Sequence, residues 1–182
     1  MFERTINLPI DEAYKDLESA LVEKGCKITS EETPKRIITK QGSLWGTTPK
    51  TAKKNLEFQL STDNNETKIT ATSRLSSDWK NITLIGVILA AILVSICGWI
   101  AIDLSNFLAT NKATVWSWLV TIHGTVNTTV AEAFVNLTKT LAVFLSIIIV
   151  FEIVVAYYAN VKIDGFAEEV LDSVIEKNKN AI

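Results

Sequence analysis

One acidic residue, Glu152, has the type and position that chemistry inside a membrane requires. It interrupts an otherwise uncharged run, residues 140–161, in which valine and isoleucine are the commonest residues. In a helix the carboxyl group would lie about 13 Å from the nearer end of this run, where an ionised acid in lipid costs about 2.5 to 3.5 kcal/mol. Three interpretations stay open: a polar contact with another subunit, a neutral acid bonded to a neighbouring helix, and a group that handles protons or cations.

Small residues are expected to face Glu152. Counting the same depth along a second apolar run, residues 81–102, arrives at Ala90 and Ala91, with Ser95 about one turn further. Small side chains let two helices approach closely, and a serine hydroxyl can bond a carboxyl group. We therefore predict an intramembrane polar contact formed by Glu152, Ala90, Ala91 and Ser95.

A basic segment lies between residues 33 and 56, where no acid occurs. Its basic residues are Lys35, Arg36, Lys40, Lys50, Lys53 and Lys54. With Trp45 in the turn-rich stretch 42–50, the segment is suited to rest on anionic headgroups or another anionic partner. The alternatives are a solvated strand face with a buried Trp45, and a docking surface for the acidic helix after residue 162. Nucleic acid is not predicted, because residues 1–80 have thirteen basic residues against twelve acidic ones.

Metal and nucleophile chemistry is not predicted. His123 is the only histidine, and neither Cys26 nor Cys97 has a cysteine or histidine at metal-binding spacing. Walker-type, GxGxxG, HExxH and GxSxG sequences are absent from the chain. We therefore predict no catalytic residue, no metal, no cofactor and no enzyme activity, and the residues name no small-molecule ligand.

Two apolar runs are the elements that must position Glu152. Residues 81–102 are uncharged throughout, and each run is long enough for a helix to cross about 30 Å of hydrocarbon. Arg74 and Lys80 precede the first run and Lys162 follows the second, whereas only Lys112 and Lys139 lie between them. The positive-inside rule then places both termini on the cytoplasmic side of a cell membrane that the chain crosses twice.

The predicted organisation has five parts. Residues 1–80 form a cytoplasmic α+β domain, 81–103 and 139–161 are transmembrane helices, 104–138 is an outer loop, and 162–182 is a cytoplasmic amphipathic helix. The outer loop is predicted to hold an interfacial amphipathic helix over residues 113–137, with a third crossing as the alternative. Trp99, Trp116 and Trp118 are predicted interfacial anchors.

Periodicity defines the α+β domain. Apolar residues alternate over residues 2–8, recur at helical spacing from Ile10 to Leu21, and later strands are expected at 26–29, 36–41, 56–60 and 69–75. The polar stretch 63–65 predicts a hairpin turn between the last two. The expected order is one strand, one helix and about four strands, which form an antiparallel sheet with a helix on one face.

The sequences GSLWG, TPKTAKKNLEFQL and ETKITATSRLSSDWKN resemble the small START-like, polyketide-cyclase type domains over residues 1–81. The resemblance implies a strand, a helix and an antiparallel sheet that a C-terminal helix closes, and it implies an apolar ligand cavity. In this chain the closing helix is expected to have become the first membrane span.

These patterns together predict a membrane-anchored accessory or scaffolding protein that assembles with itself or with a larger membrane complex. Its expected partners are membrane lipids and either further copies of the chain or other subunits. The alternative is a lipid or hydrophobic-ligand binding module on the cytoplasmic membrane surface, with Trp45 at the mouth of its pocket.

Overall fold

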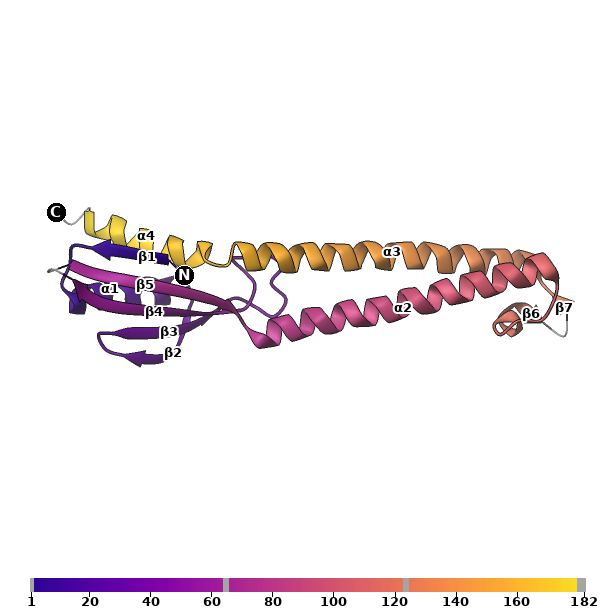
Figure 1. The fold of residues 1–182 in the computed structure, drawn as a ribbon, viewed down its shortest axis with the longest axis horizontal. Coiled ribbons are helices and arrows are strands. Elements are labelled where there is room, and N and C mark those ends of the chain that lie inside the picture. The colour runs from indigo at the N-terminus through magenta and orange to yellow at the C-terminus, as the bar shows by residue number, and fades with distance from the viewer. Residues whose placement is uncertain (1, 64–65, 123–124, 180–182) are drawn as a thin grey trace. The chain divides into compact units, whose positions relative to one another are not determined.

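The computed structural model describes the chain except for residues 1, 64–65, 123–124 and 180–182. The chain forms two compact units, and Figure 1 labels their helices and strands. The first, here called the head, combines Met1–Ile82 with Val155–Ile182, and the second, here called the hairpin, is Thr83–Val154. The head is therefore built from both ends of the chain.

One antiparallel sheet of five strands forms the head. The strands are β1 (Phe2–Ile6), β2 (Lys27–Glu32), β3 (Arg36–Gln41), β4 (Lys54–Asp63) and β5 (Glu66–Leu75). Their order across the sheet is β1-β5-β4-β3-β2, so the first strand pairs with the last. Because side chains alternate along a strand, Leu56, Phe58 and Leu60 of β4 all reach the buried face. The predicted α+β class of this unit is confirmed.

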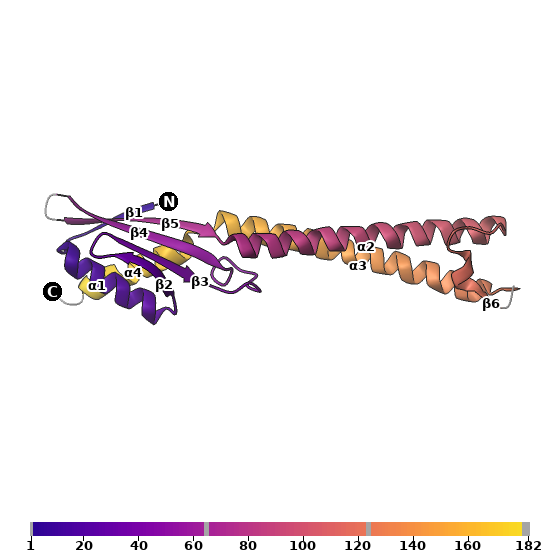
Figure 2. The same cartoon turned by 90° about the horizontal axis from the view of Figure 1, so that it is seen from below.

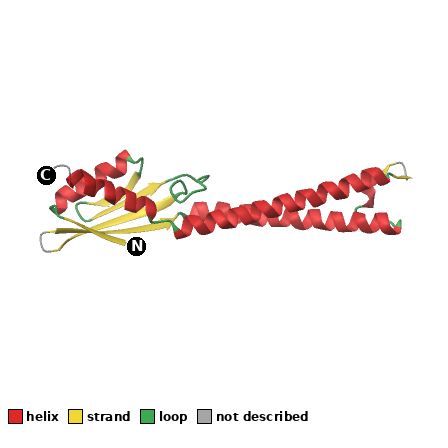
Figure 3. Cartoon of the chain, turned by 90° about the horizontal axis from the view of Figure 1, so that it is seen from above, coloured by secondary structure: helices red, strands yellow, loops and turns green. Residues whose placement is uncertain are grey.

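Two helices cover one face of this sheet (Figure 3). They are α1 (Ile10–Glu23) and α4 (Gly165–Lys179), and they lie side by side (Figure 2). Leu17 and Leu21 of α1 share a core with Phe166 and Leu171 of α4 and with the buried residues of the sheet. Apolar residues recur every three or four positions in both helices, so each turns one apolar stripe to the sheet.

The helix that closes the head is α4, and the expectation that the first membrane span had taken this role is wrong. The reason lies in the residue pattern. One side of α4 is apolar and the other is acidic, whereas the helix that starts at Ser77 is predominantly apolar on all sides between residues 82 and 102. Residues 1–80 are therefore not a complete domain, and the amphipathic helix predicted over 162–182 is part of the head core rather than a separate element.

Two helices of 34 residues, α2 (Ser77–Thr110) and α3 (Thr128–Val161), supply most of the hairpin. Between them lie a 3-10 helix, η1 (Ser117–Val120), and the short paired strands β6 (Thr121–Ile122) and β7 (Thr125–Val126). By length and composition alone, α2 and α3 are candidates to cross a membrane.

The segment that joins α2 to α3 differs from the prediction. Among the described residues of 113–137 there is no single amphipathic helix, because η1, β6 and β7 lie between Ser117 and Val126 and α3 begins at Thr128. Asp103, the last residue of the predicted first transmembrane helix, lies within α2 and accepts a hydrogen bond from the backbone N–H of Trp116 (2.8 Å). Leu104 packs with Val120 in a small core, so contacts between α2 and η1 help to organise this segment.

Candidate functional site

The carboxyl group of Glu152 lies against Gly86 in the hairpin. A Cβ atom at Gly86 would meet both carboxyl oxygens of Glu152 at 3.3 Å, so the glycine provides the space that the acid occupies. The Oε2 atom is buried, and no described residue forms a hydrogen bond with it. Buried polar atoms are usually hydrogen-bonded, which leaves Glu152 with an unused acceptor in an apolar setting.

Gly86 takes the place that the sequence analysis assigned to Ala90 and Ala91, one helical turn away. Counting depth from residue 81 was wrong because α2 begins at Ser77: Gly86 lies nine residues after that start, and Glu152 lies nine residues before the end of α3. Ser95 does not bond Glu152 among the described interactions. Its hydroxyl donates to the Ala91 carbonyl oxygen of its own helix (2.9 Å).

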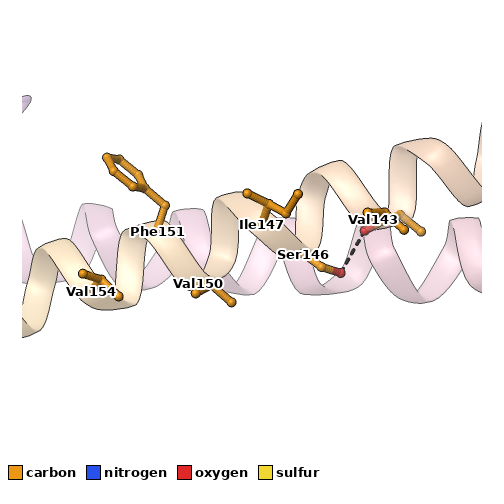
Figure 4. Close-up of a pocket in the computed structure, with 7 residues that line it drawn as sticks. Val143, Ser146, Ile147, Val150, Phe151 and Val154 are labelled. Carbon is orange, nitrogen blue, oxygen red and sulfur yellow. Dashed lines mark hydrogen bonds between the residues drawn. The ribbon is translucent and has the colours of Figure 1, made fainter.

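A shallow apolar groove of about 610 Å³ follows α3 (Figure 4). Its lining residues are Ala142, Val143, Ser146, Ile147, Val150, Phe151 and Val154. The hydroxyl of Ser146 donates to the Ala142 carbonyl oxygen (2.8 Å), so it brings no unsatisfied polar group to the groove. The groove is suited to an apolar side chain or an acyl chain.

Lys54 is completely buried in the head, and its predicted place on a basic surface is wrong. Its ammonium group donates to the carbonyl oxygens of Pro49 and Lys50 and lies 5.0 Å from the centre of the Phe166 ring. Loss of hydration lowers the pKa of Lys54 to about 8. Lys54 therefore fastens the loop before β4 to the core.

The other basic residues lie toward opposite ends of β3 and do not form one patch. Lys35 and Arg36 are at its start, where Arg36 pairs with Glu57 (2.7 Å). Near its end, Lys50 pairs with Glu169 of α4 (2.5 Å), and Lys53 pairs with Asp78 at the start of α2 (2.7 Å). The contact between Lys50 and Glu169 agrees with the alternative that the acidic helix docks on this segment.

Trp45 is 81% exposed in the loop between β3 and β4, so the alternative of a buried Trp45 is wrong. Two glycines give the loop its shape: a Cβ atom at Gly42 would collide with the Ala52 carbonyl oxygen, and one at Gly46 with that of Thr51. The Gly46 carbonyl oxygen accepts a hydrogen bond from the buried Trp79 indole in the first turn of α2 (2.9 Å). A constrained loop thus presents an exposed indole beside the start of α2.

The three predicted interfacial anchors form a cluster within the hairpin. Trp99 meets Trp116 edge to face with ring centroids 5.4 Å apart, and Trp118 follows at 6.4 Å from Trp116. Trp99 and Trp118 are more than half exposed. The anchor role stays a prediction, and the mutual contact of the rings was not anticipated.

Metal and thiol chemistry has little support among the described residues. They contain no group of three or more His, Cys, Asp and Glu side chains placed to hold a metal ion, and His123 lies outside them. Cys26 and Cys97 are buried free thiols, and burial raises the pKa of Cys26. A buried, protonated thiol is a poor nucleophile.

Two groupings were missed by the sequence analysis. Gly86 could have been found from the sequence. It is a glycine that lies as many residues after the start of α2 as Glu152 lies before the end of α3. The second grouping is a row across the sheet, formed by Lys40 on β3, Asn55 on β4 and Arg74 on β5. The sequence gives no signal for this row, because only the strand register brings these residues together.

Comparisons with known proteins leave the family open. No protein-family model and no curated protein sequence matches the chain. Among solved structures, CalU16 from Micromonospora echinospora aligns with 77% of this chain and 85% of its own, at 12% sequence identity and a TM-score of 0.32. A similarity this low supports no conclusion about the fold or the function, so the START-like resemblance of residues 1–81 stays a prediction.

Proposed function

We propose that this chain is a membrane-anchored scaffold whose α2 and α3 assemble with further copies of the chain or with other subunits of a membrane complex. The apolar surface of these two helices carries the proposal. Large side chains remain about half exposed on both, including Leu89 (56%) and Leu93 (49%) of α2 and Ile147 (62%) and Phe151 (61%) of α3. A continuous apolar surface of this kind is stable in lipid or under a partner, not in water.

The fact that both ends of the chain build the head supports two crossings of a membrane. Residues 1–82 and α4 share one core, although α2 and α3 separate them in the sequence. A chain that leaves a folded unit and returns to it must cross a membrane an even number of times. Because Arg74, Lys80 and Lys162 flank the crossings on the side of the head, the positive-inside rule supports a cytoplasmic head.

Glu152 supports assembly. Its buried Oε2 atom has no hydrogen-bond partner among the described residues, and Gly86 provides space but no polar group. A donor from a neighbouring subunit would complete the site. The groove on α3 does not include Glu152 among its lining residues, and it offers that subunit an apolar surface on another side of the helix. Polar groups of this kind join membrane helices because lipid offers no competing hydrogen bonds.

Native mass spectrometry of the full chain in mild detergent tests the assembly. Glu152→Gln, which keeps hydrogen-bonding capacity, is expected to retain the oligomer or complex, and Glu152→Leu is expected to lose it. Glu132→Leu is the matched control, since Glu132 is an exposed acid in the first turns of the same helix. An unchanged mass for Glu152→Leu would refute the contact role.

The topology has a separate test in intact cells. Single cysteines replace Lys27 in the head, Lys177 in α4 and Lys112 between α2 and α3, in a background without Cys26 and Cys97. A membrane-impermeant thiol reagent is expected to label position 112 alone. Labelling at position 177 without position 27 would contradict the hairpin.

A second candidate is a lipid or hydrophobic-ligand binding module, and the exposed Trp45 beside the start of α2 favours it. Photoreactive phosphatidylcholine in nanodiscs distinguishes the two candidates in the full chain. A ligand module predicts adducts inside the head, at residues such as Phe58 and Ile69, whereas the scaffold predicts adducts on α2 and α3.

A further inference from the structure

The face of the sheet opposite α1 and α4 carries a row of polar side chains near the point where the chain leaves the head. Lys40 pairs in register with Asn55, and Asn55 pairs with Arg74. Directly opposed residues of antiparallel strands project to the same face, so the amide of Asn55 lies between two cations. All three residues are exposed.

The row borders a cleft of about 270 Å³. Thr29 and Thr72 also line this cleft. The Thr72 hydroxyl is a hydrogen-bonding group for the cleft, whereas the Thr29 hydroxyl donates to the Ile38 carbonyl oxygen (3.1 Å). The two cations stand on strands that are two spacings apart, roughly 9.6 Å, a distance that long, flexible side chains can close around a small anion. The cleft therefore combines two cations with neutral hydrogen-bonding groups.

The positive charge of the cleft is not cancelled within the head. Among the described residues, neither the Lys40 ammonium nor the Arg74 guanidinium forms a side-chain hydrogen bond or an ion pair, although Lys40 acts on Asp78 through its charge. The one acid that lines the cleft, Glu57, already accepts a hydrogen bond from the Gln59 amide (2.8 Å) and pairs with Arg36 (2.7 Å). The bond from Gln59, and after it the bond from Arg36, hold the pKa of Glu57 below its usual value. Arg74 also acts on Glu57 through its charge, but it is not bonded to it.

We propose that this cleft binds a phosphate-type anion, with Lys40 and Arg74 on either side of it and the Asn55 amide between them. Arginine suits this ligand because its planar guanidinium can donate two parallel hydrogen bonds to phosphate oxygens. Arg74 lies three residues before α2, so a lipid headgroup can supply the phosphate if α2 enters a membrane, and free phosphate is the other source. The inference goes beyond the scaffold role and does not require it.

Isothermal titration of the full chain in a nonionic detergent tests the site. The probes are inorganic phosphate, dihexanoyl phosphatidic acid, and dihexanoyl phosphatidylcholine as the zwitterionic comparison. We expect saturable binding of at least one of the first two, stronger than that of phosphatidylcholine. Binding of phosphatidic acid alone identifies a lipid headgroup as the source, and binding of both probes shows that free phosphate suffices.

Three variants locate the binding. Lys40→Gln and Arg74→Gln are expected to weaken it at least tenfold, whereas Lys35→Gln, an exposed lysine just before the other end of β3, leaves it unchanged. All three positions are exposed, and unchanged thermal melting shows that the fold is kept. The proposal is overturned if neither phosphate probe binds saturably, or if both cleft variants bind as tightly as the unmodified chain. Detergent replaces the bilayer throughout, so failure of the scaffold proposal would not alter this result.

Discussion

The head and the hairpin place their apolar and charged side chains in opposite ways. In the head, apolar side chains such as Phe58 and Leu171 are inside, and charged pairs such as Lys50 with Glu169 lie on the rim. In the hairpin the large apolar side chains face outward, and the carboxyl group of Glu152 is partly enclosed. The difference supports our proposal that the head is surrounded by water and the hairpin by an apolar medium.

Hydroxyl groups show the same contrast. In the head the Thr67 hydroxyl donates to the distant Leu8 carbonyl oxygen (2.6 Å), a bond that fixes tertiary structure. In α2 and α3 the bonds stay within one helix and join residues four positions apart. They include Ser95 to Ala91, Ser105 to Ala101, Thr110 to Asn106, Thr138 to Phe134 and Ser146 to Ala142. A hydroxyl group that donates a hydrogen bond to its own helix needs no acceptor from another segment or from water.

The largest expected effect is the loss of the head when α4 is removed by ending the chain after Lys162. Phe166, Val170, Leu171 and Val174 are buried in the shared core, at about 1.5 to 3 kcal/mol each. Their combined contribution is comparable to the whole stability of a domain, about 5 to 15 kcal/mol. Limited proteolysis of the full chain and the truncated chain in detergent should show rapid cleavage within residues 2–75 only in the latter.

Glu168→Ala, on the exposed side of α4, is the control for this truncation and should leave the head resistant. A truncated chain with a resistant head would mean that residues 1–80 fold alone, as the sequence analysis expected.

The next effect concerns Lys54, whose charged side chain is buried in the apolar interior of the head. Its pKa falls from 10.5 to about 8 on burial, so between these pH values the unfolded chain binds more protons and stability rises with pH. Lys54→Met removes this dependence. The difference in unfolding free energy between the unmodified chain and the variant should therefore change by about 3 kcal/mol over this interval.

Pulse labelling of the buried Cys26 along a urea series measures this difference, in a Cys97→Ser background. Because Tyr14 and Cys26 also titrate at alkaline pH, the comparison with the variant is essential. Parallel pH dependences for the two proteins would show that Lys54 is hydrated in the folded head.

A smaller effect is expected in the hairpin at Gly86. A methyl group there would press on both carboxyl oxygens of Glu152, whereas Gly98 has open space around it. Gly86→Ala should destabilise the helix pair by about 1 to 2 kcal/mol relative to Gly98→Ala, as measured by dodecyl sulfate titration in mixed micelles. In a Glu152→Ala background this penalty should vanish, and its persistence would place the crowding elsewhere.

The smallest effect is expected for the rim pair of Lys50 and Glu169. Exposed ion pairs typically contribute about 0.2 to 1 kcal/mol, which a double-mutant cycle with Lys50→Ala and Glu169→Ala can measure. Hydrogen bonds from Lys50 and Lys24 lower the pKa of Glu169 in the folded head, so the contribution is present above pH 4.5 and fades as the pH falls below it. A coupling energy well above this range would mean that the pair, rather than the apolar stripe, holds α4.

Local elements of the fold were accessible from the sequence wherever one residue pattern dominated. The bounds of β3 and the start of α1 at Ile10 were predicted, because alternation and helical spacing depend only on neighbours along the chain. The segment between α2 and α3 was predicted wrongly. Its polar residues suggested a surface helix, whereas the bond from Trp116 to Asp103 and the packing of Leu104 on Val120 organise it differently.

The candidate sites depended more on tertiary structure. Glu152 was identified because a charge in an apolar run is visible in the residues themselves, but its neighbour Gly86 required the true start of α2. The six basic residues looked like one patch, and packing buried Lys54 and separated the rest.

What the sequence by itself determined is the division between an α+β head and two long apolar helices, because hydropathy and periodicity are summed over many adjacent residues. The tertiary structure alone decided that α4 completes the head, that Glu152 rests on Gly86, and that Lys40 and Arg74 flank Asn55. Each of these depends on a contact between segments far apart in the chain, and such a contact is selected by shape, register and burial together rather than by either segment alone.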